Sequence, residues 1–257
     1  ASFGGDNLKK ACEYAHSKGA KVYVTLNVMP RDKDFSALKD ITETMKTITP
    51  DAVIVSDPGV IRLIKSVFPE LEIHLSTQTS TVNSYSCNFW YDMGIKRIVL
   101  ARELSLEEIK EIRKNIPDDM ELEVFVHGSM CVSYSGRCLL SNYFTGRDAN
   151  SGKCAQPCRW KYYVTEEKRP DIPLTVEQHP EGTYLFSSKD MCMLRHLKEL
   201  KDAGVSSLKI EGRMKSAYYT AVITNAYKMA LDDIENDRPF NEKNYDEVCS
   251  VSRREYD

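Results

Sequence analysis

The chain lacks any long apolar segment. A bilayer-crossing helix needs roughly 18 or more consecutive apolar residues, and no such run occurs in the sequence. No secretory signal peptide is recognisable either, and the composition is rich in lysine and glutamate. We therefore expect a cytoplasmic protein without a membrane partner, in which thiols stay reduced and disulfides are rare.

Several catalytic and structural signatures are also missing. There is no G-x-S-x-G nucleophile elbow and no H-E-x-x-H metalloprotease helix, which counts against two common peptidase mechanisms. The sequence has no C-x-x-C knuckle of the kind that zinc ribbons use, no low-complexity segment and no obvious internal repeat. These absences disfavour a solenoid and a simple zinc ribbon.

What is present suits one sizeable globular domain. The chain has 257 residues, of which 42% are hydrophobic and 28% charged. Its net charge of −3 gives no overall support for nucleic-acid binding, although a local basic patch remains compatible with it. The chain begins without Met and ends on a charged stretch in mid-pattern, so we expect it to be a fragment of a longer protein.

Short apolar runs alternate with amphipathic helical patterns along most of the chain. This alternation predicts an α/β fold with a parallel sheet and right-handed crossovers. The pattern alone fits a barrel and an open doubly wound sheet about equally well. A capping box at Ser105 and Glu108 predicts one helix start, and Ser187 or Ser188 is expected to cap a helix that runs to Ala203. The six expected strands are Lys21 to Val28, Asp51 to Ser56, Glu72 to Ser76, Lys96 to Ala101, a strand starting at Glu121, and Ser206 to Glu211.

The strand at Glu121 leads into a polar, loop-like stretch that carries four cysteines within residues 131–158: Cys131, Cys138, Cys154 and Cys158. Disulfides, buried structural thiols and a metal site are the three explanations. A polar loop buries thiols poorly and the setting is expected to be reducing, so a metal site is favoured. Thiolates suit both zinc and an iron–sulfur cluster, and the wide spacing favours the cluster.

The same stretch carries a family resemblance. The pattern E-x-F-x-x-G-S-M-C-x4-G-x-C-x-L-S, from Glu123 to Ser141, resembles the signature of the peptidase U32 family. The following GRDANSGKCAQPCRW and the SSKDMCML stretch at 187–194 are also similar to that family, and the similarity extends from Lys9 to the end. It is strongest to the TrhP-type members, which take part in prephenate-dependent 5-hydroxylation of the wobble uridine of tRNA.

The resemblance implies a (β/α)8 TIM-like barrel whose first two strand–helix units precede this chain, with residues 128–182 as a cysteine-rich, metal-binding insertion. It implies tRNA as a partner, a small organic acid such as prephenate as co-substrate, and a 4Fe–4S cluster. Cys192 is expected in the first turn of the helix that begins near Ser188, where the helix dipole favours a thiolate. The implied cluster ligands are Cys131, Cys138, Cys154 and Cys192, with Cys158 as the alternate.

In such a barrel the residues at the carboxyl ends of the strands line the active face. We expect catalytic roles for His127, Glu211, Arg213 and Arg102, and substrate-binding roles for Asn27, Gln78, Glu103 and Lys209. Arg102 and Arg213 suit a carboxylate ligand, but Glu103 and Glu211 are equally able to neutralise them. His127 fits a proton carrier, a neighbour of the cluster or a core histidine.

Cationic and aromatic side chains alternate directly after the last loop cysteine. Arg159, Trp160 and Tyr162 are expected to contact phosphates and stack on unpaired bases of RNA, or else to plug the loop onto the barrel. Three functions compete: an RNA hydroxylase with a cluster, a peptidase that uses a cysteine nucleophile with His127, and a non-catalytic RNA-binding protein with a structural zinc.

Overall fold

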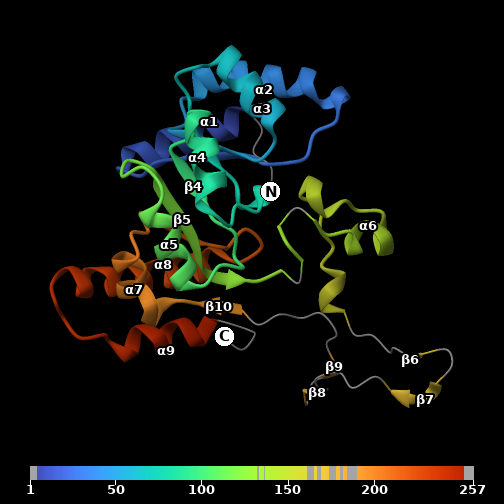
Figure 1. The fold of residues 1–257 in the computed structure, drawn as a ribbon, viewed down its shortest axis with the longest axis vertical. Helices are drawn as coiled ribbons and strands as arrows, with labels where there is room; N and C mark the ends of the chain where they lie inside the picture. Colours follow the sequence, from blue (N-terminus) through green and yellow to red (C-terminus); the bar gives the residue numbers. More distant parts are fainter. Residues whose placement is uncertain are drawn as a thin grey trace.

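A computed structural model describes residues 5–131, 133–135, 137–160, 165–166, 169–173, 178–179, 182–183 and 190–251. Its centre is a parallel sheet that runs through six of the strands (Figure 1). Their order in the sheet is β1 (Tyr23–Leu26), β2 (Ala52–Val55), β3 (Glu72–Leu75), β4 (Arg97–Val99), β5 (Glu121–Ser129) and β11 (Ser207–Ile210). The α/β class and all six predicted strands are confirmed.

The strand order separates the two architectures that the sequence pattern left open. Each of these strands pairs with the next along the sequence, and the order never reverses. A doubly wound sheet would reverse its order at a switch point, whereas a barrel adds strands in one direction. The sheet is therefore a half-barrel. Among the described residues, β1 pairs only with β2 and β11 only with β5.

Helices connect the parallel strands and bury their apolar stripes against the sheet. Leu38 and Met45 from one helix and Ile61 and Ile64 from the next belong to the same core as the strand residue Val55. The helices are α1 (Gly5–Ser17), α2 (Phe35–Ile48), α3 (Pro58–Val67), α4 (Ser84–Asp92), α5 (Leu106–Lys114), α7 (Leu197–Asp202), α8 (Ala217–Glu235) and α9 (Glu242–Val251). Short 3-10 turns lie at η1 (Asp32–Asp34), η2 (Thr77–Thr79) and η5 (Leu194–His196).

Side-chain caps fix where several of these helices begin. The Asp57 carboxylate accepts a hydrogen bond from the Val60 N–H at the start of α3. The predicted capping box of α5 is present: the Ser105 hydroxyl accepts from the Glu108 N–H, and the Glu108 carboxylate accepts from the Ser105 N–H. These bonds satisfy N–H groups that have no partner within the helix, and they therefore fix the residue at which each helix begins.

The helix predicted from Ser188 to Ala203 is wrong at its start. Residues 190–192 form a strand instead, β10 (Asp190–Cys192), which pairs antiparallel with the end of β5, and α7 begins only at Leu197. The pairing satisfies backbone groups at the end of β5, and this tertiary gain outweighs the local capping signal. Cys192 therefore lies in a strand opposite His127 and not at a helix N-terminus.

The segment between β5 and β10 leaves the sheet. It holds a short helix, α6 (Leu140–Thr145), which lies to one side of the sheet in Figure 1, and two 3-10 turns, η3 (Ala149–Ser151) and η4 (Pro157–Arg159). Two strand pairs follow, β6 (Thr165–Glu166) with β7 (Arg169–Pro173), and β8 (Gln178–His179) with β9 (Gly182–Thr183).

The apolar content serves the core of this fold. In the part of the chain that the structure describes, no helix has both the length and the hydropathy needed to cross a membrane.

Candidate functional site

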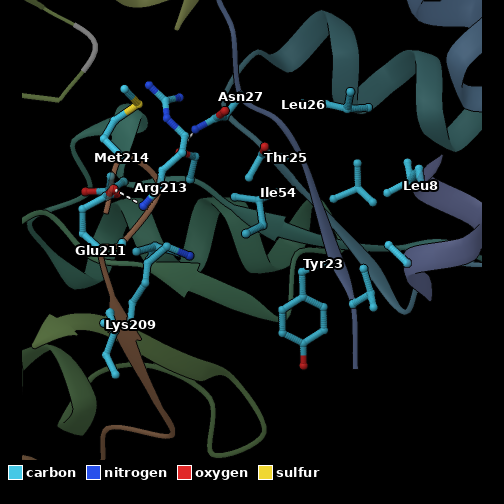
Figure 2. A pocket seen from close by; sticks show the side chains of 18 of the residues that line it. Leu8, Tyr23, Thr25, Leu26, Asn27, Ile54, Lys209, Glu211, Arg213 and Met214 are labelled. Carbon is cyan, nitrogen blue, oxygen red and sulfur yellow. Dashed lines mark hydrogen bonds between the residues drawn. The ribbon is translucent and has the colours of Figure 1, made fainter. Parts of the chain in front are cut away.

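A large cavity of about 1360 Å³ opens between the two edges of the half-barrel. Figure 2 shows Lys209, Glu211 and Arg213 along one side of it, from β11 and the turn that follows, with Tyr23 and Thr25 of β1 across from them. The floor is apolar, with Ile54 and Val99 from strands between these edges. Polar groups thus converge over an apolar floor, which is the usual composition of a small-molecule site.

Glu211 owes its position to a glycine on the neighbouring strand. Gly128 has φ of +113°, and a Cβ atom added there would lie 2.6 Å from the Glu211 carbonyl oxygen. Only glycine permits this approach of β5 to the end of β11. The Glu211 Oε1 atom in turn accepts a hydrogen bond of 3.0 Å from the Arg213 N–H, so the carboxylate orders the turn that carries Arg213.

Lys209 is held inside the half-barrel by an ion pair. Its Nζ lies 2.8 Å from Oε1 of Glu123, a side chain that is 5% exposed. Burial opposes the charge of Glu123, but Lys209, the Ser207 hydroxyl and Arg97 outweigh it, so the pKa of Glu123 lies below its usual value. The predicted substrate-binding Lys209 does line the cavity, but its charge is already matched by Glu123.

Arg102 has no matching carboxylate among the described residues. It is half-buried, its Nη2 donates a 2.8 Å hydrogen bond to the Ser135 hydroxyl, and its guanidinium lies over the Phe125 ring with 5.7 Å to the centroid. Its Nε is buried without a hydrogen-bond partner. Within the described residues no carboxylate forms an ion pair with Arg102 or Arg213, so the neutralisation by Glu103 and Glu211 that the sequence left open is not seen there. An anionic ligand would complete this side of the cavity.

A second, smaller pocket of about 210 Å³ lies on the other side of Arg102 and Ser135, which line both spaces. Gln78 also faces this small pocket, and its Oε1 is buried without a hydrogen-bond partner. Four thiols line the small pocket: Cys131, Cys138, Cys154 and Cys158.

The pKa of Cys158 reflects the other three thiols of the small pocket. Burial raises the pKa of Cys158, the neighbouring Cys131, Cys154 and Cys138 raise it further, and only Arg159 opposes them. Four thiolates so placed repel one another, and a bound cation or cationic cluster removes that repulsion. The donor set therefore fits a soft metal centre.

Among the described residues, the thiols are not gathered around a single point. Tetrahedral zinc with Zn–S bonds of about 2.3 Å would bring its sulfurs to within about 3.8 Å of one another. Among the described residues, no three Cys, His, Asp or Glu side chains are close enough to hold one ion. A cluster spreads its thiolates over several metal ions and so accepts wider spacing.

Cys192 and His127 lie apart from both spaces. Cys192 is buried, and its pKa is raised by burial and, to a lesser extent, by Cys249, against hydrogen bonds from Leu194 and Tyr227. His127 is 1% exposed, and its Nδ1 lies 3.3 Å from the Tyr227 hydroxyl. Burial lowers the pKa of His127 to about 4. The structure thus places the expected catalytic histidine in the core, against α8, and not on the cavity wall.

The remaining predicted residues divide between the two spaces and the surface. Asn27 lines the cavity and donates a 3.4 Å hydrogen bond to the Ser76 hydroxyl, and Arg159 also lines it. Glu103 is exposed and lines neither space, because it lies beyond the end of β4. Trp160 is exposed, and Tyr162 lies outside the described residues.

Three contributors escaped the sequence reasoning. Phe125 inside β5 and Tyr23 at the start of β1 line the cavity, and Ser135 joins the two spaces from the cysteine-rich segment. Alternation along β5 and β1 was the available signal for the first two, since side chains two residues apart share a face of the sheet. Nothing local marks Ser135.

Comparison with known proteins places the chain in a family. The family model described as "Peptidase family U32" matches residues 1–257. A tRNA hydroxylation protein P of Haemophilus influenzae is 38% identical over 296 residues, covering 99% of this chain and 64% of that protein. The Escherichia coli tRNA hydroxylation protein P is 40% identical, again over 99% of this chain and 64% of the relative. The chain thus spans less than two thirds of these curated relatives.

Two further matches widen the comparison. A 23S rRNA 5-hydroxycytidine synthase of Escherichia coli is 38% identical over 91% of this chain and 34% of that protein. Among solved structures, a U32 peptidase superposes with a TM-score of 0.49 at 12% identity, covering 80% of this chain and 76% of that one.

Proposed function

Because the chain belongs to peptidase family U32, we propose that it forms the larger part of an enzyme that hydroxylates RNA, with the wobble uridine of tRNA as its target. Relatives with about 38–40% identity carry the name tRNA hydroxylation protein, and another is named as a 5-hydroxycytidine synthase acting on rRNA. These names share one chemistry, the hydroxylation of RNA. The single observation from the structure that supports the proposal is the pairing of a large cavity with a pocket of four thiols across Arg102 and Ser135.

The cavity suits a small organic acid as co-substrate, and prephenate, with two carboxylates, is our candidate. Arg102 offers a guanidinium that no described carboxylate neutralises, and Arg213 offers a second near the mouth. Two cations at separate places match two carboxylates, and guanidinium groups bind carboxylates bidentately. Glu211 and Asn27 supply a hydrogen-bond acceptor and donor between them.

The small pocket suits a 4Fe–4S cluster. Cys131, Cys138 and Cys154 are the three ligands on which the family resemblance and the pocket agree. Cys158 lies in the same pocket, whereas the resemblance implies Cys192, so these two compete for the fourth position. When bound, the cluster would supply one-electron redox chemistry beside the cavity. Arg102 and Ser135 would then separate the metal centre from the ligand while contacting both spaces.

The peptidase alternative finds less support. A cysteine nucleophile needs a lowered thiol pKa and a histidine able to take its proton. In the peptidase alternative, His127 is the histidine that would take the proton of the thiol. Burial lowers the pKa of His127 to about 4. Cys192, across the β5–β10 pairing from it, is buried with a raised pKa. The lowered pKa of His127 and the raised pKa of Cys192 both disfavour a thiolate–imidazolium pair.

One experiment tests the metal and the ligands together. The full-length protein is purified without oxygen, and iron, sulfide and zinc are measured with the visible spectrum. We expect brown protein with about four irons per chain, lost in Cys131→Ser and Cys138→Ser. Of Cys158→Ser and Cys192→Ser, the one that bleaches the protein identifies the fourth ligand. Colourless protein with one zinc would contradict the cluster and favour the non-catalytic RNA-binding alternative.

A second experiment tests the reaction. Wobble 5-hydroxyuridine is quantified by mass spectrometry in tRNA from cells that lack the protein and are complemented with variants. We expect wild type to restore the modification and Arg102→Met to reduce it at least about tenfold, whereas Arg62→Met, a change on α3 away from the cavity lining, keeps it. Full activity of Arg102→Met would refute the assigned role of the cavity.

A further inference from the structure

The cysteine-rich segment exposes aromatic rings that the fold does not bury. Tyr143 on α6 is 83% exposed, Phe144 beside it 46%, and Trp160 after η4 42%. Rings of this size normally contribute to a core, and exposed groups of them mark interaction sites. We refer to Tyr143, Phe144 and Trp160 as the aromatic surface.

The three rings form one continuous feature. The centroids of Tyr143 and Phe144 are 5.1 Å apart with an interplanar angle of 84°, and those of Phe144 and Trp160 are 6.1 Å apart at 58°. Neither pair is stacked in parallel. Tyr143 and Trp160 keep 83% and 42% of their surface exposed to a flat partner, and contact between α6 and η4 holds the two parts of the surface in place.

The segment that carries these rings has a basic composition. Residues 130–160 carry four basic side chains, Arg137, Arg147, Lys153 and Arg159, against a single acidic one, Asp148. The whole chain nevertheless has a net charge of −3. The basic excess is thus local to the segment that carries the rings, as expected for a surface that meets a polyanion.

The aromatic surface also adjoins both spaces of the site. η4 places Cys158 in the small pocket and Arg159 on the cavity wall, and Trp160 follows directly. The Arg159 guanidinium is held by a 3.0 Å hydrogen bond to the Gln156 side chain. A flat group stacked at Trp160 would therefore lie next in the chain to Arg159, which lines the cavity.

We propose that Tyr143, Phe144 and Trp160 form a stacking platform for unpaired bases of the RNA, which guides the target strand past Arg159 to the cavity. The inference rests on the proposed function, since it names where that substrate docks. Planar bases stack on aromatic faces regardless of sequence, and unpaired bases are the ones whose faces are accessible. A duplex offers no such faces, so the platform distinguishes a loop from a stem.

Binding of a fluorescein-labelled tRNA anticodon stem-loop is the test, with a blunt duplex of the same stem for comparison. We expect Tyr143→Ala and Trp160→Ala each to weaken stem-loop binding by about 5- to 150-fold, as for the loss of one stacked base, and to leave duplex binding unchanged. Tyr143→Trp keeps a ring and should keep binding. Tyr85→Ala is the matched control, since Tyr85 is 88% exposed on α4 away from this segment.

A second readout reports stacking itself. The chain has two tryptophans, so a Trp90→Phe variant leaves Trp160 as the one tryptophan within these 257 residues. We expect the stem-loop to quench the emission that the Trp160→Phe variant lacks, because a stacked base quenches indole fluorescence, and the duplex to leave that emission unchanged.

The outcomes separate this inference from the function on which it rests. Unaltered stem-loop affinity in Tyr143→Ala and Trp160→Ala, with wild type still binding, overturns the platform and leaves the hydroxylase proposal standing. Relief of self-association by these variants at constant RNA affinity also overturns it, in favour of a protein partner. Wild type that binds neither RNA overturns both.

Discussion

Replacing Lys209 by methionine should destabilise the protein strongly at neutral pH, because Glu123 would stay buried without its closest cation. The Lys209 Nζ and Glu123 Oε1 atoms are 2.8 Å apart, and the two side chains are 28% and 5% exposed. With an effective dielectric constant of about 20, unit charges at this distance attract by about 6 kcal/mol. Removing one partner of a buried pair costs about 3–5 kcal/mol.

The expected loss lies at the lower end of that range, about 3 kcal/mol, because other partners of Glu123 remain. Arg97 Nη1 lies 3.8 Å from its Oε2, and the Ser207 hydroxyl donates a 2.9 Å hydrogen bond to that atom. In urea titrations at pH 7 the midpoint should fall by about 1 M, with the slope unchanged.

The pH dependence identifies the cause. In the wild type the lowered pKa of Glu123 gives stability that is present above its unfolded pKa and lost as pH falls through the folded one. In the variant, burial is less opposed and the pKa rises, so the charged form becomes costly in the folded state. The difference between the two proteins should therefore be largest at pH 7 and shrink towards pH 4.

Two control variants test whether the lost stability comes from the buried charge of Glu123. Lys198→Met removes an exposed pair with Asp202, 3.5 Å apart and more than half exposed on both sides, and should cost no more than about 0.5 kcal/mol. Adding Glu123→Gln to Lys209→Met should recover much of the lost stability and remove its pH dependence. Equal losses for Lys209→Met and Lys198→Met, or a loss that is the same at pH 4 and pH 7, would refute the reasoning.

Three further predictions concern the framework of the site. Gly128→Ala should cost about 3 kcal/mol in chemical denaturation, because its Cβ would meet the Glu211 carbonyl in a left-handed backbone; Gly19→Ala has the same φ problem but open space, and should cost only about 1 kcal/mol. Burial lowers the pKa of His127 from 6.5 to about 4, so the unfolded chain takes up a proton at higher pH than the folded protein does. The free energy of unfolding should therefore fall by about 3 kcal/mol as pH falls from 6.5 to 4. His127→Gln should flatten the stability profile there, and an unchanged slope would contradict this. Ser105→Ala should cost about 1 kcal/mol through loss of its cap, measured by thermal unfolding.

The half-barrel shows how far local patterns reach. Strands such as Ala52–Val55 were predictable because a short apolar run between turn signals is typical of a buried strand. The placement of Lys209, Glu211 and Arg102 at strand ends was predictable for a related reason. The carboxyl ends of parallel strands share one edge of the sheet. The half-barrel order then brought these residues to the same cavity.

The departures from the local sequence patterns have a common cause in long-range pairing. The stretch around Cys192 has the local signals of a helix start, but β5 offered a strand edge about sixty residues earlier in the chain, and residues 190–192 paired with it. His127 occupies a strand-end position like the others, yet its side chain turns towards Tyr227 of α8, a hundred residues later. A pattern of neighbouring residues carries no information about either of these distant partners.

The sequence by itself determined the α/β class, the six strands, the family and the grouping of thiols after β5, because each rests on residues close together in the chain. Only the tertiary structure decided which of those residues meet. It joined Arg102 to Ser135 by a hydrogen bond, matched Lys209 with Glu123, and left Tyr143, Phe144 and Trp160 exposed in the cysteine-rich segment. The physical reason is that burial and charge pairing depend on distances in space, which the order of residues along the chain does not specify.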